Sequence, residues 1–104
     1  MDVGFHRRVL ATLCALTASS YVLERYDHAH LFAESALECL NGCLDAAKYA
    51  VPLVELSIRL CWQLGKEKVD LEKKLKELRD RGHMADGAPS LLEVVVSDCM
   101  THHA

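Results

Sequence analysis

The residues best suited to chemistry in this sequence are its cysteines, and two of them have a spacing that could bind metal. Cys39 and Cys43 stand four positions apart, so on one helix both thiols reach the same side, and Cys61 could join them from a following helix as ligands of a soft metal ion. A zinc site, by contrast, usually has four ligands in pairs with short spacings, a pattern that this chain lacks. We therefore interpret the cysteines as small apolar packing residues and expect no metal or cofactor. A cysteine-based metal-binding or metal-storage bundle is the alternative.

The histidines do not form a catalytic pattern with the cysteines or acids. His28 and His30 are two positions apart, which places them on different faces of a helix, and His102 and His103 stand at the end of the chain. No histidine shares a motif with a nucleophile, and neither a glycine-rich phosphate loop nor a GxSxG turn is found. The sequence predicts a protein that is not an enzyme. Five cysteines without the spacing of a disulfide framework indicate a reducing, cytoplasmic location.

Length, composition and charge narrow the class further. The 104 residues predict a single domain, 1–104, and 51% apolar residues with five Gly and two Pro favour helices. The segment 66–81 has seven positive and five negative charges, the mixed pattern of a solvated helix face rather than a nucleic-acid footprint. The uncharged run from Val9 to Leu23 follows Arg7-Arg8 as in a secretory signal, but it is too short to span a bilayer, and we interpret it as a buried helix.

The hydrophobic pattern predicts an all-α bundle of three main helices plus a short C-terminal element. The expected helices cover about residues 3–26, 28–50 and 52–81, with Pro52 beginning the third helix after a turn near Ala50-Val51. Ser90 to Glu93 fits a capping box, which favours a short helix over residues 90–100. A strand is the alternative there, because Val94-Val95-Val96 prefers extended structure.

The third expected helix has an apolar first half and a charged second half that keeps a leucine seam. A helix from residue 52 to residue 81 would be about 44 Å long, more than one small core can cover. We therefore predict that its charged half contributes to a homodimer, with Lys68 on the seam weakening the contact while fixing register. The predicted dimer-interface residues are Leu64, Leu71, Leu75 and Leu78.

Trp62 is the strongest candidate for contact with another protein. It falls off the seam, and Gly65 and Val69 follow it along the same side of the expected helix. A large flat aromatic residue commonly dominates the energy of a protein interface, so we predict partner binding here, with Tyr49 sharing the surface. The alternative is that the first helix covers Trp62 inside the subunit.

The stretch LFAESALECLNGCLDAAKYAVPLVELSIRLCWQL, residues 31–64, resembles the QslA-like small bacterial anti-activators of quorum sensing. The resemblance is one of size and helical character over the whole chain. It implies a helical homodimer that binds a LuxR-type transcription factor (LasR-like) and blocks that regulator's dimerisation and DNA binding, without touching nucleic acid or membrane itself. An adaptor or chaperone subunit of another bacterial or phage system is the alternative.

Overall fold

The chain folds into a bundle of helices. The computed structural model describes residues 3–41, 47–80 and 90–102, and every regular element in these ranges is a helix. In chain order the helices are α1 (Val3–Val22), α2 (Tyr26–Asn41), α3 (Ala47–Leu64), α4 (Val69–Asp80) and α5 (Leu91–His102). The predicted all-α class is therefore confirmed.

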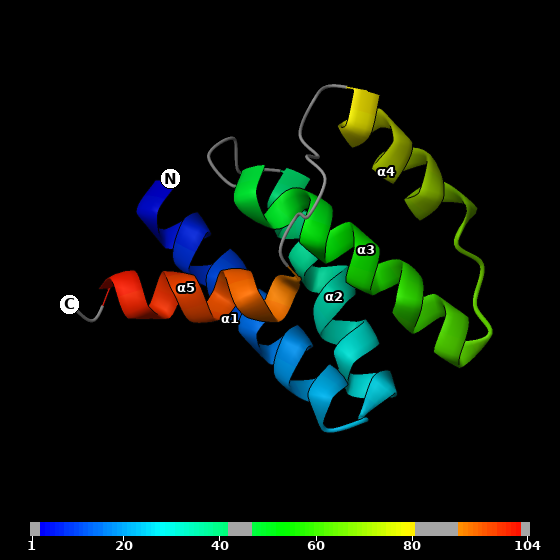
Figure 1. The fold of residues 1–104 in the computed structure, drawn as a ribbon, viewed down its shortest axis with the longest axis horizontal. Coiled ribbons are helices and arrows are strands. Elements are labelled where there is room, and N and C mark those ends of the chain that lie inside the picture. Colours follow the sequence, from blue (N-terminus) through cyan, green and yellow to red (C-terminus); the bar gives the residue numbers. More distant parts are fainter. Residues whose placement is uncertain (1–2, 42–46, 81–89, 103–104) are drawn as a thin grey trace.

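Consecutive helices pack against one another, and the last one returns to the start of the bundle. Contacts join α1 to α2, α2 to α3 and α3 to α4, while α5 lies against both α1 and α3 (Figure 1). The core between them is built from small and branched side chains. Its buried members on the first three helices are Leu10, Cys14, Ala18, Ala29, Ala33, Ala36, Tyr49, Leu53, Leu56 and Leu60. The alanines of α2 allow α1 and α3 to approach closely.

The predicted long helix over residues 52–81 is wrong, because the chain turns back at Gly65. The N–H of Lys66 donates to the carbonyl of Cys61 (2.9 Å) and that of Gly65 to the carbonyl of Trp62 (3.4 Å). This is a Schellman motif, which needs a left-handed residue, and Gly65 supplies it at φ 65°. The chain from Gly65 to Lys68 is not helical, and α4 then runs back along α3 (Figure 1).

The predicted boundary at Pro52 is also wrong, since α3 begins at Ala47 and contains the proline. Pro52 has no N–H for the helix ladder, which normally disfavours an interior position. Here the turn before it is held by packing, because Tyr49, Ala50 and Val51 are all buried. The second expected helix correspondingly ends at Asn41 rather than at residue 50, and residues 42–46 lie outside the described ranges.

The short C-terminal helix is confirmed, with the predicted cap at its start. The N–H of Glu93 donates to Oγ of Ser90, and the N–H of Ser90 donates to Oε2 of Glu93, both at 3.3 Å. Leu91, Val94 and Val95 face the core, so burial overrides the preference of valine for strands. This placement brings the first turn of α5 between α1 and α3.

Candidate docking surface

Trp62 stands on the surface near the end of α3. Its side chain is 71% exposed, so α1 does not cover it. Nζ of Lys68 lies 4.6 Å from the centroid of the indole ring, within the range of a cation–π interaction. This contact joins the ring to a residue on the far side of the chain reversal. An exposed indole is the kind of group that anchors a protein interface.

Val69 and Gly65 lie on the same chain reversal as this tryptophan. Val69 is 61% exposed at the first position of α4, and the space beside Gly65 is open. We call the surface made of Trp62, Gly65, Lys68 and Val69 the tryptophan patch. It combines an aromatic ring and a branched aliphatic side chain with an ammonium group.

Tyr49, which the sequence pattern assigned to the same surface, belongs to the core instead. Its side chain is 1% exposed, and Nζ of Lys48 lies 5.3 Å from its ring centroid. The reason is the earlier start of α3, which turns Tyr49 inward together with Leu53 and Leu56. The structure therefore does not bring Tyr49 to the tryptophan patch.

The outer face of α3 connects the tryptophan patch with a cleft. Glu55, Arg59 and Trp62 stand in successive turns on one side of the helix, at spacings of four and three residues. Arg59 is exposed and Glu55 half-buried, and both also border the cleft. Trp62 follows Glu55 by two turns of helix, so this face extends about 10 Å along α3.

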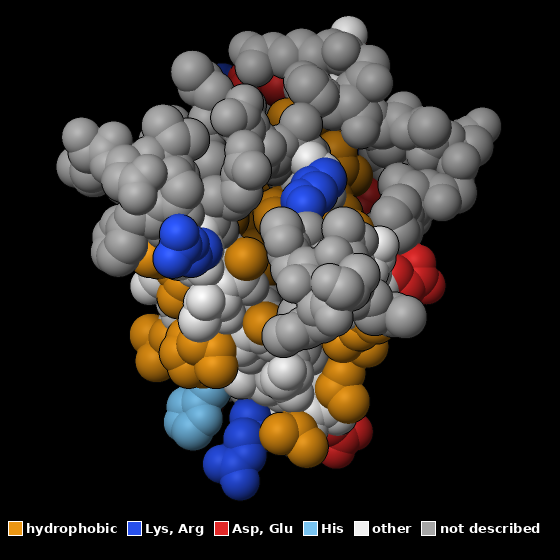
Figure 2. Space-filling model, turned by 90° about the vertical axis from the view of Figure 1, so that its left-hand side faces the viewer, with side chains coloured by type: hydrophobic (Ala, Val, Ile, Leu, Met, Phe, Trp, Pro, Cys, Tyr) orange, Lys and Arg blue, Asp and Glu red, His pale blue; other side chains and the backbone are white. Residues whose placement is uncertain are grey.

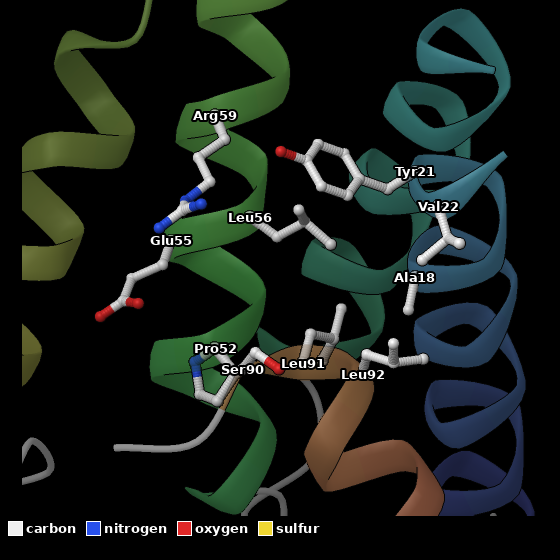
Figure 3. A pocket seen from close by; sticks show the side chains of 10 residues that line it. All are labelled: Ala18, Tyr21, Val22, Pro52, Glu55, Leu56, Arg59, Ser90, Leu91 and Leu92. Atoms are coloured by element: carbon white, nitrogen blue, oxygen red, sulfur yellow. The ribbon is translucent and has the colours of Figure 1, made fainter. Parts of the chain in front are cut away.

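The cleft lies between α1, α3 and α5 and has a volume of about 230 Å³. Leu56 of α3 and Leu91 of α5 line its inner part, and Val22 and Leu92 are exposed at its edge. Figure 3 shows Tyr21 directed from α1 toward α3, while Arg59 and Glu55 extend from α3 on the side away from α1. Small-molecule sites usually offer about 300–1,000 Å³, so the size suits one or two inserted side chains better than a whole ligand.

Sequence reasoning missed this cleft, although it identified two of the elements. The capping box located the start of α5, and Trp62 was placed on the outer side of the third helix, where Glu55 and Arg59 also stand. The pair Leu91-Leu92 was the available signal, because one of two adjacent leucines on a helix usually faces outward. What the pattern could not supply was the return of α5 to the gap between α1 and α3.

Figure 2 views the molecule from the left-hand side of Figure 1, with residues outside the description in grey. The described hydrophobic side chains form small groups separated by charged and other polar groups.

The predicted seam leucines are not aligned on one helix. Leu64 ends α3, whereas Leu71, Leu75 and Leu78 lie on α4, and all four are half-buried. Leu71 lines a second cleft, of about 270 Å³, between α2, α3 and α4, together with Leu37, Ser57 and Cys61. The α4 leucines are thus partly covered by their own chain. Their predicted role in a homodimer stays a prediction.

Cys14 and Cys61 are free thiols in buried surroundings. Burial, with a smaller contribution from Cys39, raises the pKa of Cys14 from 9.0 to about 12. Burial also raises the pKa of Cys61, against the lowering effect of Lys66 and Lys68. Within residues 3–41, 47–80 and 90–102, no three His, Cys, Asp or Glu side chains are grouped to hold a metal ion. Cys43 of the alternative metal site lies outside the described residues.

Comparison with curated proteins finds similarity to sorting nexins. Sorting nexin-21 of Mus musculus and that of Homo sapiens are each 31% identical over 93 residues, which is 89% of this chain and 25% of each relative. Sorting nexin-20 of Bos taurus is 35% identical over 69 residues, 66% of this chain and 22% of the relative. The chain therefore spans about a quarter of the length of these relatives. No protein-family model and no solved structure matches it.

The similarity to sorting nexins covers nearly all of the helical bundle. An alignment over 93 of 104 residues must include most of the helices that form the core, the cleft and the tryptophan patch. No helix in the described part of the chain has the length and apolar character to cross a membrane.

Proposed function

We propose that this chain is a non-catalytic protein-binding module whose docking surface is the outer face of α3, from the cleft to the tryptophan patch. The observation that carries the proposal is the exposure of Trp62 beside Lys68, in line with Arg59 and Glu55. An aromatic anchor at one end and an apolar cleft at the other fit a partner segment of two to three helical turns. The similarity to part of the sorting nexins supports a module that works as one portion of a larger protein or assembly.

The charges along this face favour a partner with acidic groups beside its apolar residues. Arg59 is exposed here and Lys68 lies on the indole, whereas Glu55 is half-buried. The acidic residues of the chain reversal, Glu67 and Asp70, line the other cleft, between α2, α3 and α4. Complementary charge speeds association and excludes wrong partners more than it adds affinity. An apolar segment flanked by Asp or Glu is therefore the proposed ligand.

Comparative affinity capture tests this proposal. The wild-type chain, Trp62→Ala and Leu31→Ala are immobilised at equal density, and retained proteins are identified by mass spectrometry. Leu31 is a matched control, since it is an exposed apolar residue on α2 outside the proposed surface. A partner retained by the wild type and Leu31→Ala but lost from Trp62→Ala supports the docking surface. Retention of every partner by Trp62→Ala contradicts it.

The narrower prediction of a LuxR-type partner can be tested with the same variants. A regulator's ligand-binding domain would be titrated with the wild type and with Trp62→Ala, and its own dimerisation followed by light scattering. An anti-activator would dissociate that dimer by mass action. The sorting nexin relatives are animal proteins and do not point to a bacterial regulator. The LuxR-type partner and the cytoplasmic location therefore stay predictions from the sequence.

We also propose a homodimer formed through the leucines of α4. The support is that Leu71, Leu75 and Leu78 recur on one side of a helix that buries no residue completely. Leu71→Asp combined with Leu78→Asp is expected to reduce the mass of the oligomer in light scattering. An unchanged oligomer mass would exclude these residues from the interface.

A further inference from the structure

Helix α4 is the least firmly held element of the described bundle. It has no fully buried residue, and α3 is the helix it chiefly contacts. Leu71 nevertheless faces a defined groove, whose α2 side is formed by Ala33 and Leu37 and whose α3 side is formed by Ser57 and Cys61. We call this the α2–α3 groove. A helix with half-buried leucines can leave such a groove without exposing a large part of the core.

The connection between α3 and α4 depends on the conformation of one glycine. Gly65 is left-handed at φ 65°, and nothing lies within 4 Å of the position that a side chain would occupy there. The residues that follow, Lys66, Glu67 and Lys68, are all good helix formers but are not helical in the structure. The reversal therefore rests on the Schellman motif at Gly65 and not on a proline or on a crowded turn.

The sequence pattern favours a continuous helix across this reversal. If Gly65 adopted helical angles, α3 and α4 would join from residue 47 to residue 80 into one helix about 50 Å long. Leu64, Leu71 and Leu78 would then recur every seven residues along one stripe. Trp62 and Val69 would also keep to one side, since they too are seven residues apart. The extended form would keep Trp62 and Val69 on one side but would move Lys68 off the indole, because residues six apart face different sides of a helix, and it would carry α4 away from its own groove.

We infer that α4 is exchanged between two copies of this chain, each α4 occupying the α2–α3 groove of the other copy. The occupant follows from the structure, because Leu71 of α4 already borders this groove and a second copy presents the same leucine. Exchange of an identical element forms a closed two-fold dimer from existing contacts. The equilibrium between the monomer and the exchanged dimer then depends on Gly65 and on the new contacts between the two extended helices. This inference rests on the proposed homodimer, and its test requires no partner at the tryptophan patch.

Two variants of the connection between α3 and α4 should shift the monomer–dimer equilibrium in opposite directions. Gly65→Ala strains the left-handed turn and favours the continuous helix, so dimerisation should tighten by on the order of tenfold or more. Insertion of two glycines after Lys66 lengthens the connection, which should favour the monomer because short hinges promote exchange. Gly65→Asn is the matched control, since Asn tolerates the left-handed conformation. Sedimentation velocity over a concentration series measures all three, with circular dichroism confirming that each is folded.

Isotope-filtered NMR identifies the exchange itself. Equal amounts of labelled and unlabelled Gly65→Ala are unfolded together, refolded and examined for contacts of Leu71 with Ala33 and Leu37. Contacts between labelled and unlabelled chains support the exchange. Contacts confined to single chains in a dimer overturn the exchange while leaving the homodimer standing. Equal association constants for Gly65→Ala, Gly65→Asn and the wild type overturn the role of Gly65, and a dimer that survives Leu71→Asp with Leu78→Asp overturns the interface itself.

Discussion

Nζ of Lys68 lies 4.6 Å from the ring centroid of Trp62, so a residue beyond the end of α3 holds the aromatic ring at the end of that helix. The contact spans the chain reversal and couples the exposed indole to the position of α4. It gives the surface a defined shape, although Trp62 contributes little to the core. Replacing such a residue should weaken the binding of a partner without lowering the stability of the fold.

Trp62→Ala should leave the free energy of unfolding nearly unchanged, within about 1 kcal/mol, because the side chain remains 71% exposed in the folded state. Leu53→Ala should instead cost about 2–5 kcal/mol, since Leu53 is completely buried in the same core as Leu56 and Tyr49. Urea denaturation of the two variants measures the difference. A loss for Trp62→Ala as large as that for Leu53→Ala would show that the tryptophan belongs to the core.

Lys68→Met should change the fluorescence of the protein without unfolding it. Trp62 is the only tryptophan in the chain, so the emission spectrum reports on this site alone. Removing the ammonium loses a cation–π contact of about 0.5–1 kcal/mol and frees the ring to sample other orientations. Lys73→Met is the control, because Lys73 is an exposed lysine of α4 outside the tryptophan patch, and its loss should leave the emission spectrum unchanged.

Identical spectra for the wild type and Lys68→Met would contradict the contact between the lysine and the ring. Binding gives a second measurement. Because Lys68 contributes positive charge to the proposed docking surface, an acidic partner segment should associate more slowly with Lys68→Met, and the difference should shrink as salt is added.

The helical class and the start of α5 could be predicted from the sequence because both depend on local signals. The apolar periodicity predicted the helical class but not every helix boundary, and the Ser90–Glu93 capping box marks the first turn of α5 through two reciprocal hydrogen bonds. These interactions form within a few residues of chain. They do not depend on which other helix lies nearby.

The two wrong boundaries depend on packing that no local pattern specifies. Pro52 lies inside α3 because Tyr49 and Val51 in the preceding turn are buried against the rest of the bundle. Gly65 ends α3 although the heptad continues past it, because α4 can place its leucines against its own chain. A heptad indicates that an apolar seam must pack against another helix. It does not show whether that helix belongs to the same chain or to a second one.

The candidate site could be predicted only in part, because some of its residues depend on local sequence and others on packing between helices. Trp62 and Val69 are both exposed, on either side of the reversal at Gly65, and their role in binding a partner stays a prediction. Tyr49 and the cleft could not be placed, because the first depends on where α3 begins and the second on how α5 returns to α1.

Ser90→Ala should weaken the start of α5 by about 1 kcal/mol, the usual effect of removing an N-cap side chain. The hydroxyl accepts the N–H of Glu93, so the variant leaves that donor to water. Glu93→Gln is the control, because its amide oxygen can still accept the N–H of Ser90. Hydrogen exchange at the amide of residue 93 measures the effect, and equal protection in the wild type and Ser90→Ala would contradict the cap.

The buried thiol of Cys14 should make the protein less stable in alkali. Burial raises its pKa from 9.0 to about 12, so above pH 9 the unfolded chain loses a proton that the folded chain retains. The contribution of this thiol is therefore nearly constant below pH 9 and becomes increasingly unfavourable as the pH rises toward 12. Cys14→Ala removes this group and should lose less stability between pH 8 and pH 10 than the wild type. Urea denaturation at both pH values measures the two changes, and equal changes for the two proteins would show that Cys14 does not titrate in this way.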